Sequence, residues 1–309
     1  MRILYYNEGE DPNEWLPKLA AALPEADIRL WQEGDTEPAD YALVWHPPAA
    51  LFENRQGLKA IFNLAAGVDS LLRLSHVIPS TIPIFRLEDA GMAIQMAEYV
   101  THAVLRYYRR FDEYERLARE KKWEMLDPFK RQDFTIGIMG MGVMGTAVAQ
   151  ALSPFGFPVR GWSRHKKNIG FVDDFHGDNQ LEAFLKDLRI LICLLPLTPE
   201  TKDILNMDRF QKLQKGAYLI NMGRGAHLVE EDLLTALETG QIRAATLDVT
   251  REEPLPENHP FWKKENITIT PHIGALTFCQ ATVEQVTRHI HAFEKGEKLT
   301  SLVDRNTGY

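Results

Sequence analysis

The fold is decided by the stretch Phe134-Thr-Ile-Gly-Ile-Met-Gly-Met-Gly-Val-Met-Gly145, in which an apolar run ends in spaced glycines. Gly140, Gly142 and Gly145 form the pattern G-x-G-x-x-G, and residues 143–152 carry apolar side chains at helical spacing. In a strand-turn-helix unit, the first glycine permits the tight turn. The second lets a pyrophosphate approach the backbone, and the third lets the helix pack closely on the strand. A glycine-rich turn that binds nothing has the same spacing, but the flanking strand and helix favour a dinucleotide site.

The start of the predicted helix supplies the expected phosphate contacts. Val143, Met144 and Gly145 lie in its first turn, where backbone amides have no intrahelical acceptor and the helix dipole favours negative charge. We therefore expect Gly140, Gly142 and these three residues to bind the pyrophosphate of the cofactor.

The end of the next strand predicts which nicotinamide dinucleotide is bound. An acidic residue about 20 positions after the glycines accepts hydrogen bonds from the ribose of NAD. Here residues 162–167 read Trp-Ser-Arg-His-Lys-Lys instead. Ser163 and Arg164 suit a ribose 2′-phosphate, because a guanidinium holds that group by charge-assisted hydrogen bonds. The segment predicts NADPH (NADP+ when oxidised), with a solvated basic loop as the alternative.

Composition limits the class of protein. With 309 residues, the chain is long enough for about two domains. A formal net charge of −8 argues against a general nucleic-acid or membrane surface. The N-terminus has no apolar stretch of signal-peptide length, and the longest apolar run, 190–195, is far shorter than the roughly 20 residues of a membrane helix. The two cysteines, Cys193 and Cys279, argue against a disulfide framework. We expect a cytoplasmic protein that binds no metal.

Alternation of apolar runs with polar or helical stretches predicts an α/β fold with mainly parallel sheets. A long helix from Gly91 onwards, with many charges between residues 106 and 122, predicts a connector between two domains. A later helix returns the chain to the first domain. We therefore assign residues 1–98 and 281–309 to one domain and 99–280 to the other. The predicted strands are 3–6, 28–31, 41–45, 60–64 and 82–87 in the first domain, and 134–139, 157–162, 189–195, 217–222, 244–249 and 267–270 in the second.

Three polar residues near the ends of predicted strands are candidates for catalysis: Arg224, Glu253 and His272. Reduction of a 2-oxo acid needs a cation for the carboxylate, a proton donor for the carbonyl oxygen, and a hydride. Arginine grips a carboxylate in two places, and histidine exchanges a proton near neutral pH. A carboxylate bonded to that histidine would orient the ring and stabilise its cationic form. Taken singly, however, such a histidine is more often structural, and a glutamate is usually a surface charge.

A small-residue turn after the fourth predicted strand is a candidate for substrate binding. Amides of Ala66, Gly67 and Val68 could hold a carboxylate, since ligands of open α/β sheets gather beyond the carboxyl ends of strands. On local grounds alone, an ordinary turn is favoured.

The order of these motifs resembles the D-2-hydroxyacid dehydrogenase family over nearly the whole chain. The resemblance implies a bilobal homodimer acting on a small 2-oxo acid, in which a Rossmann cofactor domain is inserted into a flavodoxin-like substrate-binding domain. Both domains are then doubly wound parallel sheets. The matching segments are Ala66-Gly-Val-Asp69, the Gly140 motif, Leu195-Pro-Leu-Thr-Pro-Glu-Thr201, Asn221 to Gly225, Asp248 with Glu253-Pro-Leu-Pro256, and Thr270-Pro-His272.

The resemblance also assigns roles. It implies that Arg224, Glu253 and His272 form the catalytic trio and that Arg224 and His272 contact the substrate. Amides of the turn at Gly67 would bind the substrate carboxylate, and Asp248 would face the nicotinamide amide. Further cofactor contacts are implied for Leu195, Pro196, Thr201 and Met222.

Within the family, the chain is most similar to a group of bacterial glyoxylate and hydroxypyruvate reductases, through residues 40–48, 85–92 with 95–99, and 133–137. This similarity implies NADPH-dependent reduction of glyoxylate to glycolate and of hydroxypyruvate to D-glycerate. Glu88-Asp-Ala-Gly91 replaces the Asn-x-Pro-Gly that is usual before the connector helix. Trp45 either closes the substrate pocket against larger side groups or belongs to the core.

Two other functions stay open. One is a dehydrogenase for a different acid, such as 3-phosphoglycerate or a bulky aromatic 2-oxo acid. The other is a dinucleotide-sensing protein of the co-repressor type, which binds protein partners and can keep the same trio.

Overall fold

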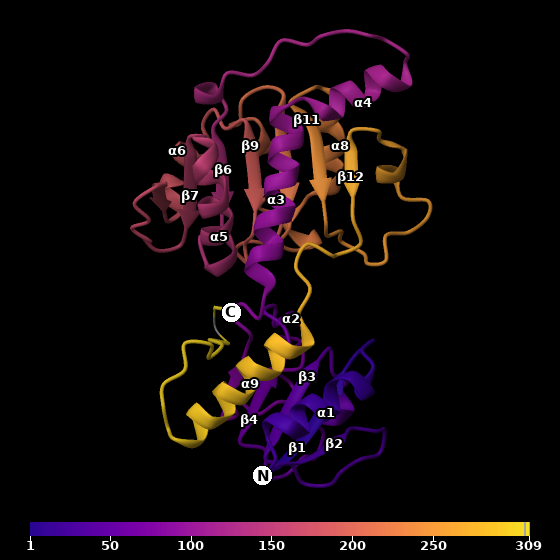
Figure 1. The fold of residues 1–309 in the computed structure, drawn as a ribbon, viewed down its shortest axis with the longest axis vertical. Coiled ribbons are helices and arrows are strands. Elements are labelled where there is room, and N and C mark those ends of the chain that lie inside the picture. The colour runs from indigo at the N-terminus through magenta and orange to yellow at the C-terminus, as the bar shows by residue number, and fades with distance from the viewer. Residues whose placement is uncertain (306, 309) are drawn as a thin grey trace. The chain divides into compact units, whose positions relative to one another are not determined.

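The computed structural model describes residues 1–305, 307 and 308 and divides into two compact units (Figure 1). Unit 1 consists of Met1–Met92 and Thr277–Tyr309, and unit 2 of Ala93–Leu276. The predicted crossings, after residues 98 and 280, lie a few residues later than these. The first differs because Met96 already packs in a core of unit 2. Residues 306 and 309, which the prediction assigned to the first domain, lie outside the described residues.

Unit 1 is built on a five-stranded parallel sheet with the strand order β2-β1-β3-β4-β5. Ile3, Leu4 and Tyr5 of β1 are fully buried, as expected for a parallel strand that is covered on both faces. The strands are β1 (Arg2–Asn7), β2 (Asp27–Leu30), β3 (Tyr41–Trp45), β4 (Ala60–Asn63) and β5 (Ile84–Phe85). The helices are α1 (Pro12–Ala22), α2 (Asp69–Leu72) and α9 (Cys279–Glu294), with a 3-10 turn at Ala49–Leu51.

The C-terminal part of the chain completes unit 1. Helix α9 packs against α1, and Leu302 forms an antiparallel bridge with Phe85 at the β5 edge of the sheet. Helix α1 begins at an N-cap, where the Asp11 side chain accepts a hydrogen bond from the amide of Asn13 at 2.9 Å. The strand order reverses between β1 and β3, which is the switch point of a flavodoxin-like sheet.

Unit 2 is built on a seven-stranded parallel sheet with the order β12-β11-β10-β9-β6-β7-β8. This is the Rossmann order extended by one strand, and its switch point lies between β6 and β9. The strands are β6 (Ile136–Met139), β7 (Val159–Ser163), β8 (Asp173–His176), β9 (Ile190–Cys193), β10 (Ala217–Asn221), β11 (Ile242–Leu247) and β12 (Ile267–Ile269). The helices are α3 (Met92–Tyr108), α4 (Phe111–Arg119), α5 (Val143–Leu152), α6 (Leu181–Leu185), α7 (Met207–Phe210) and α8 (Glu230–Glu238). Short 3-10 turns lie at Arg131–Asp133, Ser153–Phe155, Asp178–Gln180, Gly225–His227 and Pro260–Lys263.

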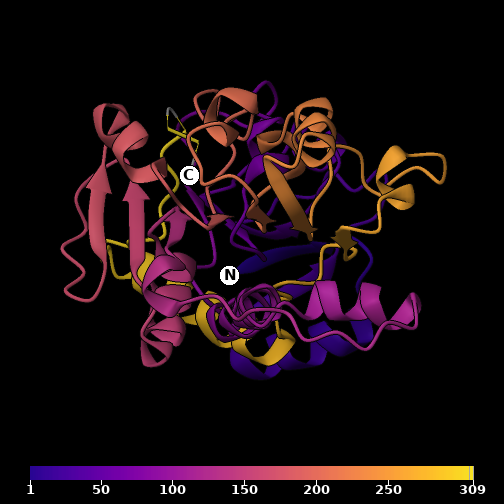
Figure 2. The same cartoon turned by 90° about the horizontal axis from the view of Figure 1, so that it is seen from above.

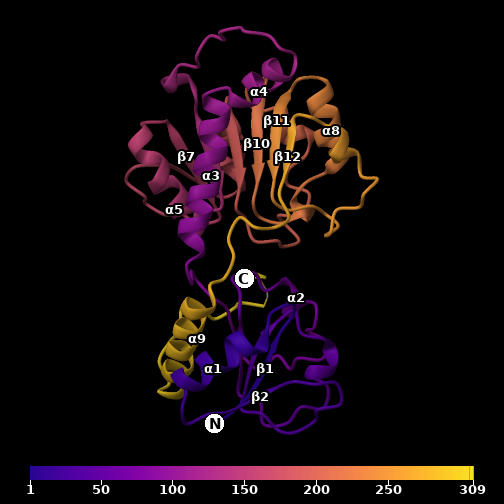
Figure 3. The same cartoon turned by 45° about the vertical axis from the view of Figure 1, so that its right-hand side comes forward.

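Both faces of the sheet of unit 2 are covered, so the unit has two cores. Side chains of α3 and α5 pack on one face with Ile136, Ile138 and Tyr218, and side chains of α6, α7 and α8 pack on the other. Figure 1 and Figure 3 show α3 along one face of the sheet, and Figure 2 looks nearly along its axis. The predicted α/β class with two doubly wound sheets is confirmed.

Two local features differ from the sequence-based expectation. The predicted long charged helix is two helices, because Arg110 adopts a left-handed conformation (φ 61°) between α3 and α4. Strand β8 was not predicted; it is a polar edge strand in which only Phe175 is apolar. Over the described part of the chain, no helix is both long and apolar enough to cross a bilayer.

Candidate active site

The predicted site residues of unit 2 follow the carboxyl ends of its strands, the edge at which ligands bind in doubly wound sheets. The glycine turn follows β6 at the switch point, and Arg164 follows β7. The three candidate catalytic residues follow β10, β11 and β12, which are adjacent in the sheet. Sheet order therefore gathers, at one edge, residues that are far apart in the sequence.

The three glycines of the turn differ in what surrounds them. At Gly140 and Gly145 the fold leaves no room for a side chain, whereas Gly142 faces open space. Gly140 has φ +102°, and a Cβ there would lie 2.6 Å from the carbonyl oxygen of Leu194. A Cβ on Gly145 would lie 2.0 Å from the carbonyl oxygen of Gly140. At Gly142, by contrast, a Cβ would meet nothing within 4 Å. Gly142 thus keeps open the approach to the start of α5.

The start of α5 is suited to an anion. Gly142 is the N-cap and provides no side-chain hydrogen bond to the first turn. The amides of Val143 and Met144 lie in that turn, where the helix dipole also favours negative charge. The open glycine and the first-turn amides therefore fit the pyrophosphate of a dinucleotide.

The loop after β7 carries the residues predicted to select the cofactor. Ser163 is buried, and its hydroxyl donates a hydrogen bond to the carbonyl of His165 at 2.7 Å, which shapes the loop. Arg164 is exposed. The pKa of Glu200, in the loop after β9, is lowered chiefly by a hydrogen bond with Thr198, and the charge of Arg164 contributes. Arg164 follows β7 and Glu200 follows β9, and the carboxyl ends of these parallel strands lie at the same edge of the sheet.

Arg224 is held by a compact loop after β10. The fully buried Asn221 accepts a hydrogen bond from the amide of Gly223 (3.3 Å) and donates one to the carbonyl of Arg224 (3.1 Å). The guanidinium Nη1 of Arg224 donates to the carbonyl of Gly223 at 2.8 Å. A Cβ on Gly225 would lie 1.9 Å from the backbone of Thr250. This glycine therefore lets the loop after β11, which carries Glu253, pack directly against the Arg224 loop.

Glu253 and His272 form a hydrogen-bonded pair. The His272 Nδ1 lies 2.8 Å from Oε2 of Glu253, and the other carboxylate oxygen accepts a hydrogen bond from the amide of Thr250 at 3.0 Å. With Nδ1 on the carboxylate, Nε2 is the ring atom left for a substrate oxygen. Burial alone would raise the pKa of Glu253. Hydrogen bonds from His272 and Thr250, with the charges of His272 and Arg224, instead lower that pKa below its ordinary 4.5.

His272 has a left-handed backbone (φ 55°), which a residue with a side chain rarely adopts. Asp248 holds this conformation from the end of β11. Its carbonyl accepts a hydrogen bond from the amide of His272 (2.9 Å), and its buried carboxylate accepts from Thr270 Oγ1 (2.6 Å) and the amides of Ile273 (2.9 Å) and Gly274 (2.8 Å). Asp248 therefore fixes the loop that carries His272, in addition to the cofactor contact predicted for it.

Pro196 and Thr201, two of the other predicted cofactor contacts, lie in one loop after β9. The Thr201 hydroxyl donates to the carbonyl of Pro196 at 2.7 Å and also accepts from the amide of Thr198 at 2.8 Å. Leu195 starts this loop, and Met222 follows β10, so both lie at the same sheet edge as the glycine turn.

In unit 1, the predicted substrate turn follows β4. Asn63, the buried last residue of β4, donates through Nδ2 to the carbonyls of Ala65 and Gly67, both at 2.7 Å. Drawing these carbonyls towards Asn63 shapes the turn that contains Ala66, Gly67 and Val68. Trp45 ends the neighbouring strand β3; it is half-buried and stacks on His46, with ring centroids 4.0 Å apart.

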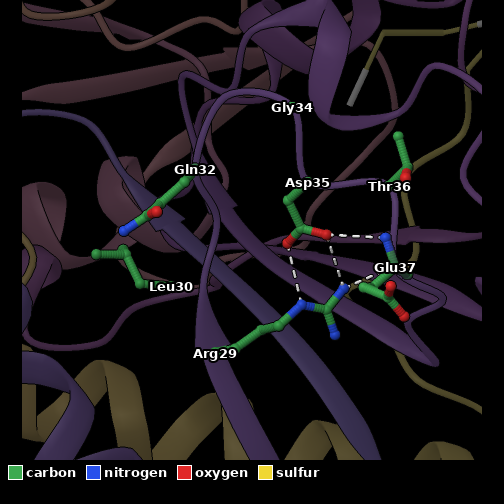
Figure 4. Close-up of a pocket in the computed structure, with 7 residues that line it drawn as sticks. All are labelled: Arg29, Leu30, Gln32, Gly34, Asp35, Thr36 and Glu37. Carbon is green, nitrogen blue, oxygen red and sulfur yellow. Dashed lines mark hydrogen bonds and ion pairs between the residues drawn. The ribbon is translucent and has the colours of Figure 1, made fainter.

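A surface hollow of unit 1, drawn in Figure 4, lies apart from these residues. The residues that line it include the ion pair of Arg29 and Asp35, in which Nε of Arg29 lies 3.0 Å from Oδ2 of Asp35. Arg55, with a nearly buried side chain, pairs with the same carboxylate at 3.1 Å. Two guanidinium groups thus share one carboxylate, and the predicted site residues do not line the hollow.

Sequence reasoning missed two residues that organise the site, Asn63 and His227. Asn63 had a detectable signal, since it is the one polar residue in the otherwise apolar predicted strand of residues 60–64. His227 is fully buried beside Arg224, and no local pattern distinguishes it.

Comparison with known proteins identifies the family. The model of the D-isomer specific 2-hydroxyacid dehydrogenase NAD-binding domain matches residues 101–274, which lie within unit 2. The fold and this match define unit 2 as a dinucleotide-binding domain of an oxidoreductase. The chain belongs to the D-isomer specific 2-hydroxyacid dehydrogenase family, as the resemblance predicted.

Relatives match over the full length. The chain is 52% identical to glyoxylate/hydroxypyruvate reductase A of Serratia proteamaculans and 49% identical to that of Yersinia enterocolitica, in each case over 100% of both chains. Among solved structures, a D-isomer specific 2-hydroxyacid dehydrogenase from Xanthobacter autotrophicus, in complex with NADPH and MES, is 38% identical. It gives a TM-score of 0.94 and covers 100% of this chain and 99% of its own. The NADPH-dependent glyoxylate/hydroxypyruvate reductase of Sinorhizobium meliloti, with NADP and sulfate, is 35% identical with a TM-score of 0.93 over the same shares.

Proposed function

We propose that this protein is an NADPH-dependent reductase of small 2-oxo acids, which converts glyoxylate to glycolate and hydroxypyruvate to D-glycerate. The observation that carries the proposal is the 2.8 Å hydrogen bond between His272 and Glu253, formed on strand ends adjacent to that of Arg224. This pair supplies a positioned proton donor for a carbonyl oxygen. Full-length relatives of 47–52% identity that are named for this activity support the choice of substrates.

The cofactor is held by residues that follow strands of unit 2. The open backbone at Gly142 and the amides of Val143 and Met144 would bind the pyrophosphate. Arg164 would bind the ribose 2′-phosphate together with Ser163, whose hydroxyl would turn from the carbonyl of His165 to the phosphate. When bound, NADPH supplies the hydride that reduces the carbonyl carbon. The remaining proposed contacts are Gly140, Gly145, Leu195, Pro196, Thr201, Met222 and Asp248.

The protein's own residues supply the carboxylate binding and the proton. In unit 2, Arg224 is the proposed contact for the substrate carboxylate, and it also stabilises negative charge that develops on the carbonyl oxygen. In unit 1, the proposed carboxylate contacts are the amides of Ala66, Gly67 and Val68. His272 donates a proton from Nε2 to that oxygen, so that hydride and proton together convert the ketone or aldehyde to an alcohol. Glu253 keeps the ring oriented and balances the imidazolium before the proton is given. We assign substrate binding to residues 1–98 with 281–309 and cofactor binding to residues 99–280.

We further propose a cytoplasmic homodimer that acts on a small molecule, without nucleic-acid or membrane partners. The thiols of Cys193 and Cys279 are both free and buried, which suits a reducing compartment. Trp123 and Met125 are almost fully exposed in unit 2, and exposed large apolar side chains favour a protein contact. A net charge of −8 gives no support to nucleic-acid binding.

A substrate panel tests the function. The purified protein is mixed with NADPH or NADH and with glyoxylate, hydroxypyruvate or a bulkier 2-oxo acid, and loss of the reduced nicotinamide absorbance is followed. We expect turnover of glyoxylate and hydroxypyruvate and a higher kcat/KM with NADPH than with NADH. Tight NADPH binding without turnover of any acid would indicate a dinucleotide sensor instead. A clear NADH preference would remove the assignment of Arg164.

A further inference from the structure

His227 is a fully buried histidine beside Arg224, and its ring is hydrogen-bonded on both sides. We propose, on the basis of the proposed function, that His227 is a positioning residue. It fixes the backbone of the substrate-binding Arg224 and the cofactor-facing loop at Pro196 relative to each other. Both ends of this link lie in unit 2.

The two hydrogen bonds define the ring's state. Nδ1 accepts from the amide of Arg224 at 2.9 Å, and Nε2 lies 3.2 Å from the carbonyl oxygen of Pro196. An amide can only donate and a carbonyl can only accept. The ring must therefore be the neutral tautomer that carries its proton on Nε2.

The ring packs closely against the backbone of Gly223. A Cβ on Gly223 would lie 2.8 Å from Nδ1 of His227 and 3.0 Å from the carbonyl oxygen of Leu195. The backbone of His227 is also tied, since its carbonyl accepts from the amide of Leu205 at 2.8 Å. The side chain thus links, by its two hydrogen bonds, the loops that follow the neighbouring strands β9 and β10.

The two hydrogen-bond partners of His227 have different proposed ligands: Arg224 contacts the substrate, and Pro196 contacts the cofactor. At one end, the amide that His227 binds belongs to Arg224, whose guanidinium is turned back onto the carbonyl of Gly223. At the other end, the Pro196 carbonyl accepts from both His227 and Thr201. Because misplacement of a substrate-positioning group by about 1 Å can cost two orders of magnitude in rate, loosening either end should have a measurable effect.

The two bonds can be removed separately. In His227→Asn, the shorter side chain keeps an acceptor near the Nδ1 position for Arg224 but does not reach Pro196. In His227→Gln, the longer side chain keeps a donor near the Nε2 position for Pro196 but no acceptor for Arg224. His227→Phe keeps the volume of the ring and removes both bonds.

Each variant has its own expected result. In His227→Asn we expect kcat to stay near wild type and the NADPH dissociation constant, measured by fluorescence titration without substrate, to rise by about ten-fold, the usual worth of one hydrogen bond. In His227→Gln we expect the reverse, with NADPH binding nearly unchanged and kcat/KM for glyoxylate reduced by about ten-fold or more. His227→Phe should show both losses. His289→Gln, at a buried histidine of unit 1, is the control for loss of stability alone.

The outcomes separate the explanations. Equal effects of the asparagine and glutamine variants on both ligands would overturn the proposal, as would lower melting temperatures with wild-type kinetics and binding. If the phenylalanine variant does not fold, the other two variants decide. If the wild type turns over none of the acids, the proposed function fails, while the NADPH titrations still test the Pro196 end of the link.

Discussion

His272, the proposed proton donor, has a backbone conformation that favours glycine and, among residues with side chains, asparagine. Replacement by alanine would therefore confuse loss of the imidazole with loss of the loop conformation. We expect His272→Asn to keep the melting temperature and the KM for glyoxylate near wild type. Its kcat should fall by about 10²- to 10⁴-fold, because general acid catalysis is lost. Steady-state kinetics and a thermal melt decide this, and a kcat near wild type would mean that another group donates the proton.

The ionisation of Glu253 makes the interaction between Glu253 and His272 depend on pH. Its lowered pKa means that its pairing stabilises the protein above pH 4.5 and that this contribution is lost as pH falls through the lowered value. At neutral pH the carboxylate is therefore ionised and hydrogen-bonded to Nδ1 of His272, so its negative charge lies beside the proposed proton donor. In Glu253→Gln we expect reductase activity to decline towards high pH earlier than in wild type, with kcat at neutral pH lower by about ten-fold.

The pH profile of kcat is the measurement for this pair. Glu252→Gln, at the exposed neighbouring carboxylate, is the matched control and should leave the profile unchanged. A profile of Glu253→Gln that coincides with wild type would contradict the assigned role of Glu253.

Trp45, in unit 1, is the residue that we propose restricts the size of the substrate. Trp45, whose ring is half-buried, is the last residue of β3. Strand β3 lies beside β4, and the turn at Gly67 follows β4. We expect Trp45→Ala to raise kcat/KM for larger 2-oxo acids relative to glyoxylate by about ten-fold or more, since a side chain contact of this size is worth that much discrimination. Trp262→Ala, at an exposed tryptophan of unit 2, is the control. An unchanged substrate ratio would remove Trp45 from the pocket.

At the scale of the elements, the glycine turn separates what the fold needs from what the cofactor needs. A methyl group at Gly145 would lie 2.0 Å from a backbone oxygen, whereas one at Gly142 would meet nothing within 4 Å. We expect Gly145→Ala to destabilise the protein by about 1–3 kcal/mol, the usual cost of overpacking. Gly142→Ala should leave the unfolding free energy near wild type and weaken NADPH binding by about ten-fold or more, because the methyl group occupies the phosphate approach. Denaturant unfolding and NADPH titration check the two variants. Wild-type NADPH affinity in Gly142→Ala would exclude the turn as the phosphate site.

The strands were predictable where they are buried on both faces. Parallel strands of this kind, such as β1 and β9, read as continuous apolar runs. Strand β8 lies at a sheet edge with a polar sequence, so no such run marks it. The break between α3 and α4 was missed because Arg110 in a left-handed conformation has no sequence signal comparable to glycine.

The site was predictable where a motif fixes a local shape and unpredictable where contacts come from distant segments. The glycine turn is a strand-turn-helix motif within twelve residues, Phe134 to Gly145, and its geometry follows from its spacing. The shaping of the turn at Gly67 by Asn63 depends on the direction of a buried side chain. The link from His227 to Pro196 spans 31 positions, and only the neighbouring order of β9 and β10 brings them together.

At the scale of the whole molecule, each unit fixes the two segments by which the chain crosses between the units. In unit 2, the Gln95 side chain donates to the carbonyl of Leu276 at 2.7 Å and accepts from its amide at 3.3 Å. In unit 1, Gly91 has φ +84°, and a Cβ there would lie 2.7 Å from the ring of Phe278. The outgoing and returning segments are therefore held side by side within each unit.

Gly91→Ala tests the packing of these crossing segments. Gly9 has a similar φ of +79° but open space around it, so Gly9→Ala measures the left-handed strain alone. We expect Gly9→Ala to cost about 1–2 kcal/mol of unfolding free energy and Gly91→Ala to cost more, because the ring of Phe278 must also move. Chemical denaturation of both variants gives the comparison. Equal losses would show that the ring yields without cost.

The return of α9 to unit 1 has a consequence for synthesis on the ribosome. Unit 2 is one unbroken stretch, whereas the sheet of unit 1 lacks its α9 cover and the Leu302 bridge until residues 279–302 have been translated. During translation of residues 93–276, the side of α1 that packs against α9 is therefore uncovered. These residues form a unit of their own, and domains generally fold as units. Unit 1, whose strands precede unit 2 in the chain, can thus be completed only after unit 2 has been translated.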